Sequence, residues 1–166
     1  MIKDHLEYIK GAARKNFENS GCIVPVFISE IDGEKVIMPL YWNGPEDKEA
    51  FAMQLQNWIA SGSISEYVMV CEAWVVKSKK EDGVSDARDW IRNKGSLESH
   101  PERSEMVMIQ YSSPKEEIDS FAEIIRDGDS ATLSGWEDTH RVVGVSLDVL
   151  GSRFKGLFAK STAGLN

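Results

Sequence analysis

The sequence predicts an α+β domain, in which an antiparallel sheet of about five or six strands packs against two main helices, residues 2–18 and 46–61. Three observations support this class. Apolar residues recur every three or four positions in both helical segments. Asp32-Gly33 separates two strand-like runs, and residues 66–77 are mostly apolar on both alternating faces. We expect both helices to lie against one face of the sheet.

Both helices are predicted from an apolar stripe and from signals at their ends. The stripe of residues 2–18 consists of Ile2, Leu6, Ile9, Ala13 and Phe17. Gly21 follows as a stop signal, because glycine readily adopts the left-handed conformation that closes many helices. The second helix follows Pro45, which suits the first helical position, and ends before Gly62. Its stripe consists of Phe51, Leu55, Trp58 and Ile59.

Residues 22–42 are predicted to form a β-hairpin. Asp32-Gly33 favours a type I′ turn, because both central positions of that turn need positive φ. The turn sets a register in which partners match in polarity: Glu30 with Lys35, Ile28 with Ile37 and Phe27 with Met38. Pro39 lacks an N–H group, so the second strand is expected to be an edge strand there or to end.

Residues 66–77 are predicted to form a long central strand with both faces covered. Residues 105–111 have the same character and are its expected partner. Residues 78–104 form a long polar excursion between them, with a short helix expected from Ser85 to Gly95. The stretch from Lys79 to Val84 has almost no apolar content, so we expect it to be mobile.

The last third of the chain leaves one alternative open. Residues 113–126 fit a helix that starts at a Ser-Pro cap, because apolar residues follow at helical spacing. They also fit one strand of a hairpin around Asp127-Gly128, which we favour because it extends an antiparallel meander. A last strand is expected over residues 142–150. The tail is expected to dock through Phe154, Leu157 and Phe158 and to fray over residues 159–166.

The length and composition predict one domain over residues 1–166, located in the cytoplasm. A net charge of −8 argues against binding to nucleic acid or to a membrane, because phosphate groups attract clustered Lys and Arg. No apolar run approaches the roughly 18 residues of a membrane-spanning helix. Charges interrupt the N-terminal residues, unlike a secretory signal. Cys22 and Cys71 both lie in apolar, strand-like surroundings and are expected to be free, buried thiols.

The sequence contains no motif of standard catalytic or cofactor chemistry. Its glycines form no phosphate-binding loop, and no serine lies in a Gly-x-Ser-x-Gly context. Neither cysteine has a second cysteine at zinc-site spacing, and the three histidines are far apart. We therefore expect no cofactor and no metal site.

One group of polar residues accompanies the central strand. Glu72 lies inside that strand, where a carboxylate is costly unless it is paired. Pairing with the next strand brings His100, Arg103 and Glu105 toward the Trp74 end. Acid–base sites have this composition, with Glu72 or His100 as the base and Arg103 holding an anionic substrate. We favour a structural network, because no nucleophile, metal or phosphate cradle accompanies the group.

Arg103 is the residue of this group with the strongest expected effect on stability. Its guanidinium is expected to form a forked ion pair with Glu72 or Glu105. Arg103→Ala is then expected to cost roughly 2–4 kcal/mol, because it leaves a buried carboxylate unpaired.

Two further features bear on binding. Candidate binding residues are Trp74, beside the polar group, and Trp90 and Trp136, at predicted loop edges, because such tryptophans often anchor interfaces. Residues 116–138 carry eight carboxylates against a single arginine, Arg126. This segment is either a solvated sheet edge that charge protects from aggregation or a docking face for a basic partner. The solvated edge is the favoured interpretation.

A pattern of motifs links several of these residues. Ala73-Trp74 ends a predicted strand, residues 99–105 read Ser-His-Pro-Glu-Arg-Ser-Glu, and a hydrophobic strand follows. This pattern resembles a group of small uncharacterised bacterial and bacteriophage proteins, which have an Ala-Trp strand and then a His-Pro-x-Arg-x-Glu-like motif. Arg-Asp-Gly at residues 126–128 is similar too, so the resemblance covers roughly residues 66–136. It implies no activity, substrate or cofactor.

We therefore expect a non-enzymatic protein-binding or accessory protein, derived from a phage or a mobile element. The alternative is a small hydrolase- or transferase-like enzyme that uses Glu72, His100, Arg103 and Glu105. The expected partner is another protein or a second copy of this chain. Self-association would use the strand edge at residues 34–41 or a loop tryptophan.

Overall fold

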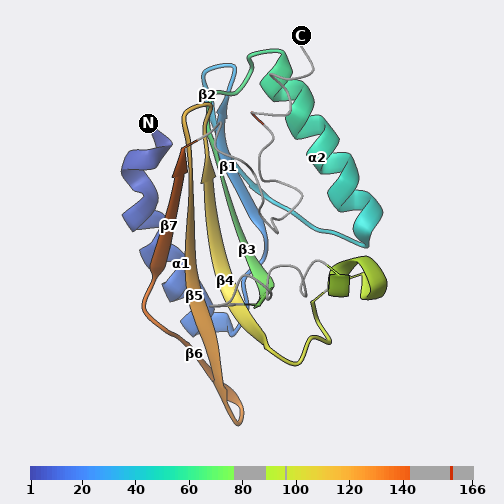
Figure 1. Cartoon of the computed structure of the whole chain (residues 1–166). Helices are drawn as coiled ribbons and strands as arrows, with labels where there is room; N and C mark the ends of the chain where they lie inside the picture. Colours follow the sequence, from blue (N-terminus) through green and yellow to red (C-terminus); the bar gives the residue numbers. More distant parts are fainter. Residues whose placement is uncertain (77–88, 96, 143–157, 159–166) are drawn as a thin grey trace.

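The computed structural model describes residues 1–76, 89–95, 97–142 and 158. A curled antiparallel sheet of seven strands forms its centre (Figure 1). The elements in chain order are η1 (Ile2–His5), α1 (Leu6–Ser20), β1 (Val26–Ile31), β2 (Glu34–Pro39), α2 (Pro45–Ala60), β3 (Tyr67–Val76), β4 (Arg103–Ser112), β5 (Glu116–Asp127), β6 (Ser130–Leu133) and β7 (Glu137–Val142). The predicted α+β class is confirmed.

The strands follow the order β2-β1-β3-β4-β5, and both β6 and β7 pair with the far side of β5. β3 lies between β1 and β4, so its predicted central position and its predicted partner strand are confirmed. The long strands reflect sequence runs in which both alternating sets of side chains are apolar, since such runs need cover on two faces.

The hairpin of β1 and β2 has the predicted register. Ile28 pairs with Ile37 and Glu30 with Lys35. Asp32 and Gly33 have φ of 50° and 86°, which is the backbone that a type I′ turn requires. β2 is an edge strand and ends at Pro39, as the missing N–H group predicts.

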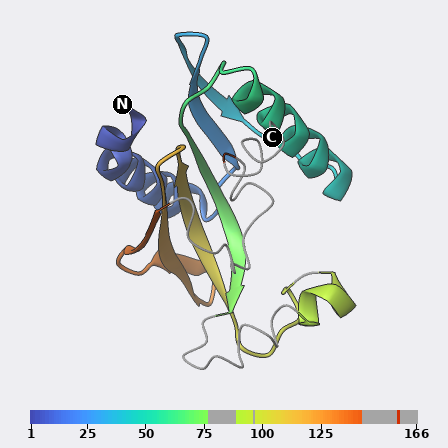
Figure 2. The same cartoon turned by 45° about the horizontal axis from the view of Figure 1, so that its top comes forward.

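The two long helices cover opposite faces of the sheet (Figure 1, Figure 2). α1 packs on the face of β3 that carries Val68 and Val70, here called the α1 face. α2 packs on the face that carries Tyr67 and Met69, here called the α2 face. The expectation that both helices share one face is therefore wrong. Successive side chains of β3 point to opposite faces and are apolar on both, so each face needs its own cover.

The helix ends follow the sequence signals. α1 is preceded by the short turn η1 and ends at Gly21, whose φ is 73° and whose N–H donates to the Phe17 carbonyl at 2.7 Å. Gly62, with φ of 75°, follows α2 in the same way. None of the helices in the described ranges is long and apolar enough to cross a membrane.

The open alternative for residues 113–126 resolves as a strand. β5 and β6 form the predicted hairpin, and Gly128 in its turn has a φ of 61°. Tertiary pairing overrides the local cap signal here, because β5 finds partners along both of its sides.

Several expectations concern residues outside the described ranges. Residues 89–94 are helical, inside the range predicted for the short helix, whereas Lys79–Val84 lie outside the described residues. β7 ends at Val142, so the strand expected up to residue 150 also lies outside them, as do Phe154, Leu157 and residues 159–166. Phe158 is buried, and its ring stacks on Tyr67 with centroids 5.8 Å apart.

Candidate functional site

The polar group predicted around Glu72 is divided into separate contacts. A carboxylate oxygen of Glu72 accepts a hydrogen bond from the Ile23 backbone N–H at 2.7 Å. Glu105 accepts two hydrogen bonds from the Arg126 guanidinium, at 2.8 and 2.5 Å. These bonds from Arg126 hold the pKa of the Glu105 carboxyl below its usual range. Each carboxylate therefore has a partner that the sequence analysis did not name.

Arg103 is exposed and does not form the expected fork onto Glu72 or Glu105. It donates to the carbonyl oxygen of His100 at 3.0 Å, and its guanidinium lies over the Trp74 ring, 5.2 Å from the centroid. The pairing expectation is wrong because Arg126, which reaches across from the neighbouring strand β5, occupies Glu105 instead.

His100 lies apart from both carboxylates. Its side chain is buried, with the ring edge-on to Trp90 at 4.8 Å between centroids, and its Nδ1 accepts the Glu102 backbone N–H at 3.1 Å. Within the described ranges, no hydrogen bond or ion pair joins the side chains of the four candidate residues to one another. Of the candidate tryptophans, Trp74 contacts Arg103, Trp90 contacts His100, and Trp136 is among the residues that line a pocket.

The acidic segment 116–138 divides into three environments. Glu117 and Asp119 lie on the α2 face and are each 2% exposed, next to Gln110 and Ser112 of β4. The interpretation as a solvated edge is therefore wrong for these two carboxylates. Burial, reinforced by the negative charges of Glu117 and Asp119, raises the pKa of the nearby Tyr67 hydroxyl.

A second set of carboxylates ties the helical N-terminus to the sheet. Glu116 accepts hydrogen bonds from Lys3 and from His140, and these bonds hold the pKa of the Glu116 carboxyl below its usual range, with Lys3 as the largest cause. Asp138 pairs with Lys10 of α1 at 3.0 Å. These contacts are structural, since they join elements far apart in sequence.

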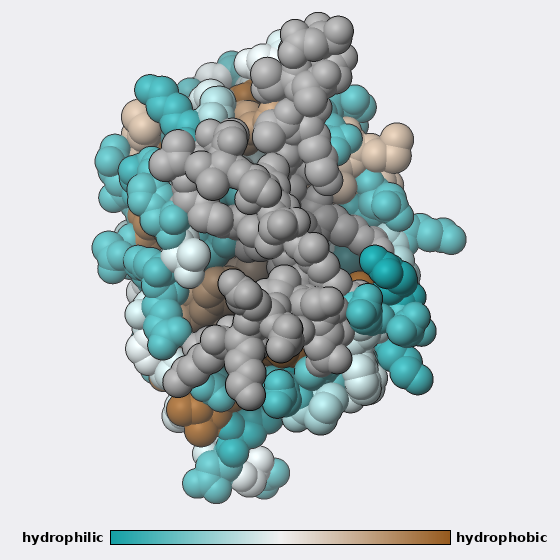
Figure 3. Space-filling view, viewed as in Figure 1, coloured by the Kyte–Doolittle hydropathy of each residue, from teal (hydrophilic) through white to brown (hydrophobic). Residues whose placement is uncertain are grey.

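The remaining carboxylates are exposed, and we call them the acidic edge: Glu123, Asp127, Asp129 and Glu137. Within the part of the chain that the structure describes, Glu123, Asp127 and Asp129 form no ion pair. Figure 3 shows mostly hydrophilic side chains along the margin of the molecule where α1 and β7 lie. Among the described residues, Glu123, Asp127 and Asp129 therefore carry negative charge that no ion pair balances.

The chain passes from β6 to β7 through a β-bulge beside β5. Ser134 lies opposite Glu123, because its N–H donates to the Glu123 carbonyl at 2.9 Å, and Glu137 lies opposite Phe121. Two residues, Gly135 and Trp136, therefore oppose the single residue between those positions of β5. An extra residue of this kind bends the strand and re-aims side chains. It also explains the seventh strand, since β6 and β7 are two halves of one interrupted edge.

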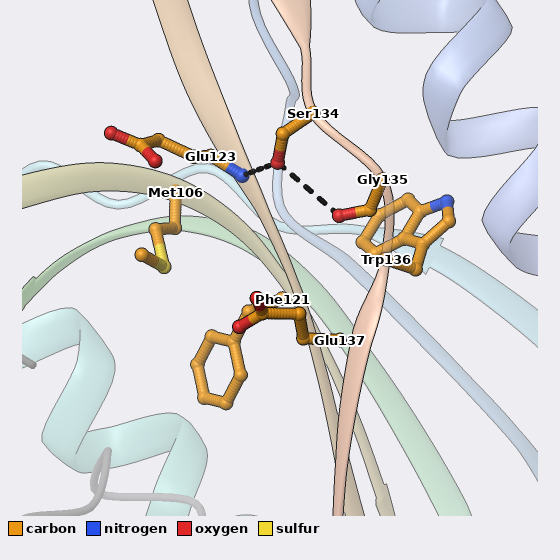
Figure 4. A pocket seen from close by; sticks show the side chains of 7 residues that line it. All are labelled: Met106, Phe121, Glu123, Ser134, Gly135, Trp136 and Glu137. Atoms are coloured by element: carbon orange, nitrogen blue, oxygen red, sulfur yellow. Dashed lines mark hydrogen bonds between the residues drawn. The ribbon is translucent and has the colours of Figure 1, made fainter.

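A pocket of about 280 Å³ opens at this bulge (Figure 4). We call it the bulge pocket; its lining residues are Met106, Phe121, Glu123, Ser134, Gly135, Trp136 and Glu137. Figure 4 shows Met106 between Glu123 and Phe121, with the Glu137 carboxyl beside Phe121. The register agrees, because Met106 pairs with Glu123 and Phe121 with Glu137. The pocket combines an apolar floor with two carboxylates.

The wall of the pocket is held in place by hydrogen bonds. The Ser134 hydroxyl accepts the Glu123 N–H at 2.8 Å, a position that the Ser134 carbonyl would fill in a regular ladder. That carbonyl and the carbonyl of Leu133 instead accept the Arg14 guanidinium of α1, at 2.5 and 2.8 Å. The guanidinium also lies 5.8 Å from the Trp136 ring centroid.

Metal and thiol chemistry find little support in the described part of the chain. No group of three or more metal-ligating side chains is present among the residues described. Both cysteines are free, as expected. Burial raises the pKa of the Cys71 thiol to about 11, which disfavours the reactive thiolate at neutral pH. Cys22 is exposed and outside any strand, so its expected burial is wrong.

Comparison with known proteins adds nothing to this geometry: no family model, no curated protein and no solved structure matches the chain. The site is therefore interpreted from its residues alone. Of the lining residues, Trp136 was predicted as a candidate binding residue, and Glu123 and Glu137 belong to the acidic segment 116–138 for which a docking face was the alternative. Gly135 next to Trp136, between two strand-like runs, is the one local signal for the bulge.

Proposed function

We propose that this is a non-catalytic binding protein that recognises a basic segment of another protein through the acidic edge. The observation that carries the proposal is the bulge pocket, a hollow in which Met106 and Phe121 lie beside carboxylates of that edge. Protein docking sites combine apolar floors with polar rims in this way. The net charge of −8 supports the same choice, because it attracts a basic partner and repels an acidic one.

The enzymatic alternative is not adopted. Acid–base catalysis needs its groups within hydrogen-bond reach of one reacting centre. Glu72, Glu105 and Arg103 are instead engaged with Ile23, Arg126 and Trp74. No specific observation in the fold favours a reaction at that group.

The proposal predicts salt-dependent binding of a basic peptide. A capped octapeptide of alternating lysine and glycine should shift the amide NMR signals of the acidic edge at low ionic strength. An octapeptide with glutamate in place of lysine should not. Binding should disappear in about 1 M salt, where the Debye length is only about 3 Å.

Two double variants that remove the same negative charge test whether the peptide binds at the acidic edge. Glu123→Gln with Glu137→Gln should weaken lysine-peptide binding severalfold. Glu18→Gln with Glu49→Gln removes the same charge from exposed helix positions and should leave binding nearly unchanged. Equal effects of the two double variants, or signal shifts confined to α2, would contradict the proposal.

A further inference from the structure

We infer that the bulge pocket receives a single long cationic side chain, a lysine or an arginine, of the partner segment. The inference rests on the proposed function and deepens it, because it states what enters the pocket. The acidic edge alone would attract any basic surface. The bulge pocket adds a place where one side chain is enclosed.

The size of the pocket suits one side chain. Its volume is about 280 Å³. Pockets that enclose drug-sized ligands span about 300–1,000 Å³, so this hollow is at the lower limit of that class. Glu123, Gly135 and Glu137 of its lining are exposed to solvent. A side chain that projects from a docked segment can therefore enter from outside.

The chemistry of the lining matches the two parts of a lysine or arginine side chain. Met106 and Phe121 supply apolar surface against which a methylene stem packs. The Glu123 carboxylate, which forms no ion pair among the described residues, is the partner for the cationic end, and the Phe121 ring adds attraction for a cation. A neutral apolar side chain would leave Glu123 without an ion pair, and an anionic one would be repelled.

Arg14 acts as a positioning residue for this pocket. It does not line the hollow, but it holds the carbonyls of Leu133 and Ser134 from the opposite side of the bulge. Those two bonds fix the segment that carries Gly135 and Trp136. Since a lysine has no planar fork, Arg14→Lys cannot make both bonds with the same geometry.

The test varies one side chain of a small peptide. Capped heptapeptides of glycine and serine, with lysine, arginine, norleucine or alanine at the centre, are titrated into the full chain. The readouts are the backbone signals of Ser134 and Gly135 and the indole signal of Trp136. Lysine or arginine should produce saturable shifts, whereas norleucine, which keeps the stem without the charge, and alanine should produce much weaker ones.

Two matched variants extend the test. Glu123→Gln should weaken binding of the lysine or arginine heptapeptide about twofold to fivefold, the size of an exposed charge pair. Glu49→Gln removes one charge from an exposed position of α2, outside the acidic edge, and should have no measurable effect. Arg14→Lys should weaken binding as well, while the dispersion of the remaining NMR signals shows that the fold is intact.

Each outcome is decisive for one of the two proposals. If norleucine binds as well as lysine, or if Glu123→Gln and Glu49→Gln weaken binding equally, the single-side-chain inference is overturned. The proposed function still stands in that case, provided that the lysine–glycine octapeptide binds the acidic edge in a salt-dependent way. If neither peptide binds, both proposals fail.

Discussion

The two halves of β5 place the same residue types in opposite environments. In the first half, Glu117 and Asp119 lie on the α2 face and are 2% exposed. Glu123, four residues after Asp119, points to the same face of the strand but is exposed to solvent. Nothing in the local sequence distinguishes these carboxylates, so the difference comes from what lies beside and above them.

The neighbouring strands account for part of this difference. The first half of β5 is paired on both sides, with β4 and with β7. The register with β4 ends at Glu123, and beyond it β5 pairs with β6 alone. A carboxylate among paired strands is sealed by its neighbours, whereas one at the end of the pairing stays in water. The same negative charge is buried in one half and exposed to solvent in the other.

The prediction with the largest expected effect tests whether the second half of β5 is buried on one face and exposed to solvent on the other. Ile124 is 6% exposed and packs with Phe17 on the α1 face, whereas the adjacent Ile125 is 51% exposed. Ile124→Ala should cost about 2–5 kcal/mol through the cavity that it creates. Ile125→Ala should cost less than about 1 kcal/mol. Urea melts of both variants check this, and coincident midpoints would show that β5 is not one-sided there.

A smaller effect is expected for Arg103, at the exposed end of β4. Arg103→Ala should lower the free energy of unfolding by about 1 kcal/mol, because it loses one hydrogen bond and a cation–π contact in a solvated place. This is less than the 2–4 kcal/mol expected from a buried fork. Arg92→Ala, at a 78% exposed arginine, is the control and should cost almost nothing. A loss of about 3 kcal/mol or more in the free energy of unfolding is the size expected when a buried ion pair is broken. That result would support the original prediction that Arg103 pairs with a buried carboxylate.

The smallest effect is a dependence of stability on pH. The folded-state pKa of Glu105 lies below its ordinary value of 4.5, because Arg126 donates to the carboxylate. A lowered folded pKa contributes stability above the unfolded pKa, and that contribution is lost as the pH falls through the folded value.

The advantage of the wild type over Glu105→Gln should therefore be less than about 1 kcal/mol at pH 7 and should vanish well below pH 4. Urea midpoints of both proteins measured across this range check it. A constant difference down to pH 2 would mean that the Arg126 pair does not stabilise the fold.

Features that depend only on residues close together in the chain were predicted correctly from the amino-acid pattern. Asp32-Gly33 needs only its own backbone preferences to form the turn, and the turn then sets every pair of the hairpin. Gly21 and Gly62 end their helices for a similarly local reason. The double-sided apolar pattern of residues 66–77 was enough to place β3 at the centre of the sheet.

Contacts between residues far apart in the chain could not be predicted in this way, because they depend on how the strands and helices pack. The choice of Arg126 over Arg103 as the partner of Glu105 depends on how β5 lies beside β4. The bulge pocket depends on four separate segments, since β4 and β5 provide its floor, the link between β6 and β7 provides its wall, and Arg14 of α1 holds that wall. Periodicity reports which face a side chain takes along one strand. It does not indicate which residue from a distant part of the chain contacts that side chain, because the packing of the whole chain determines this contact.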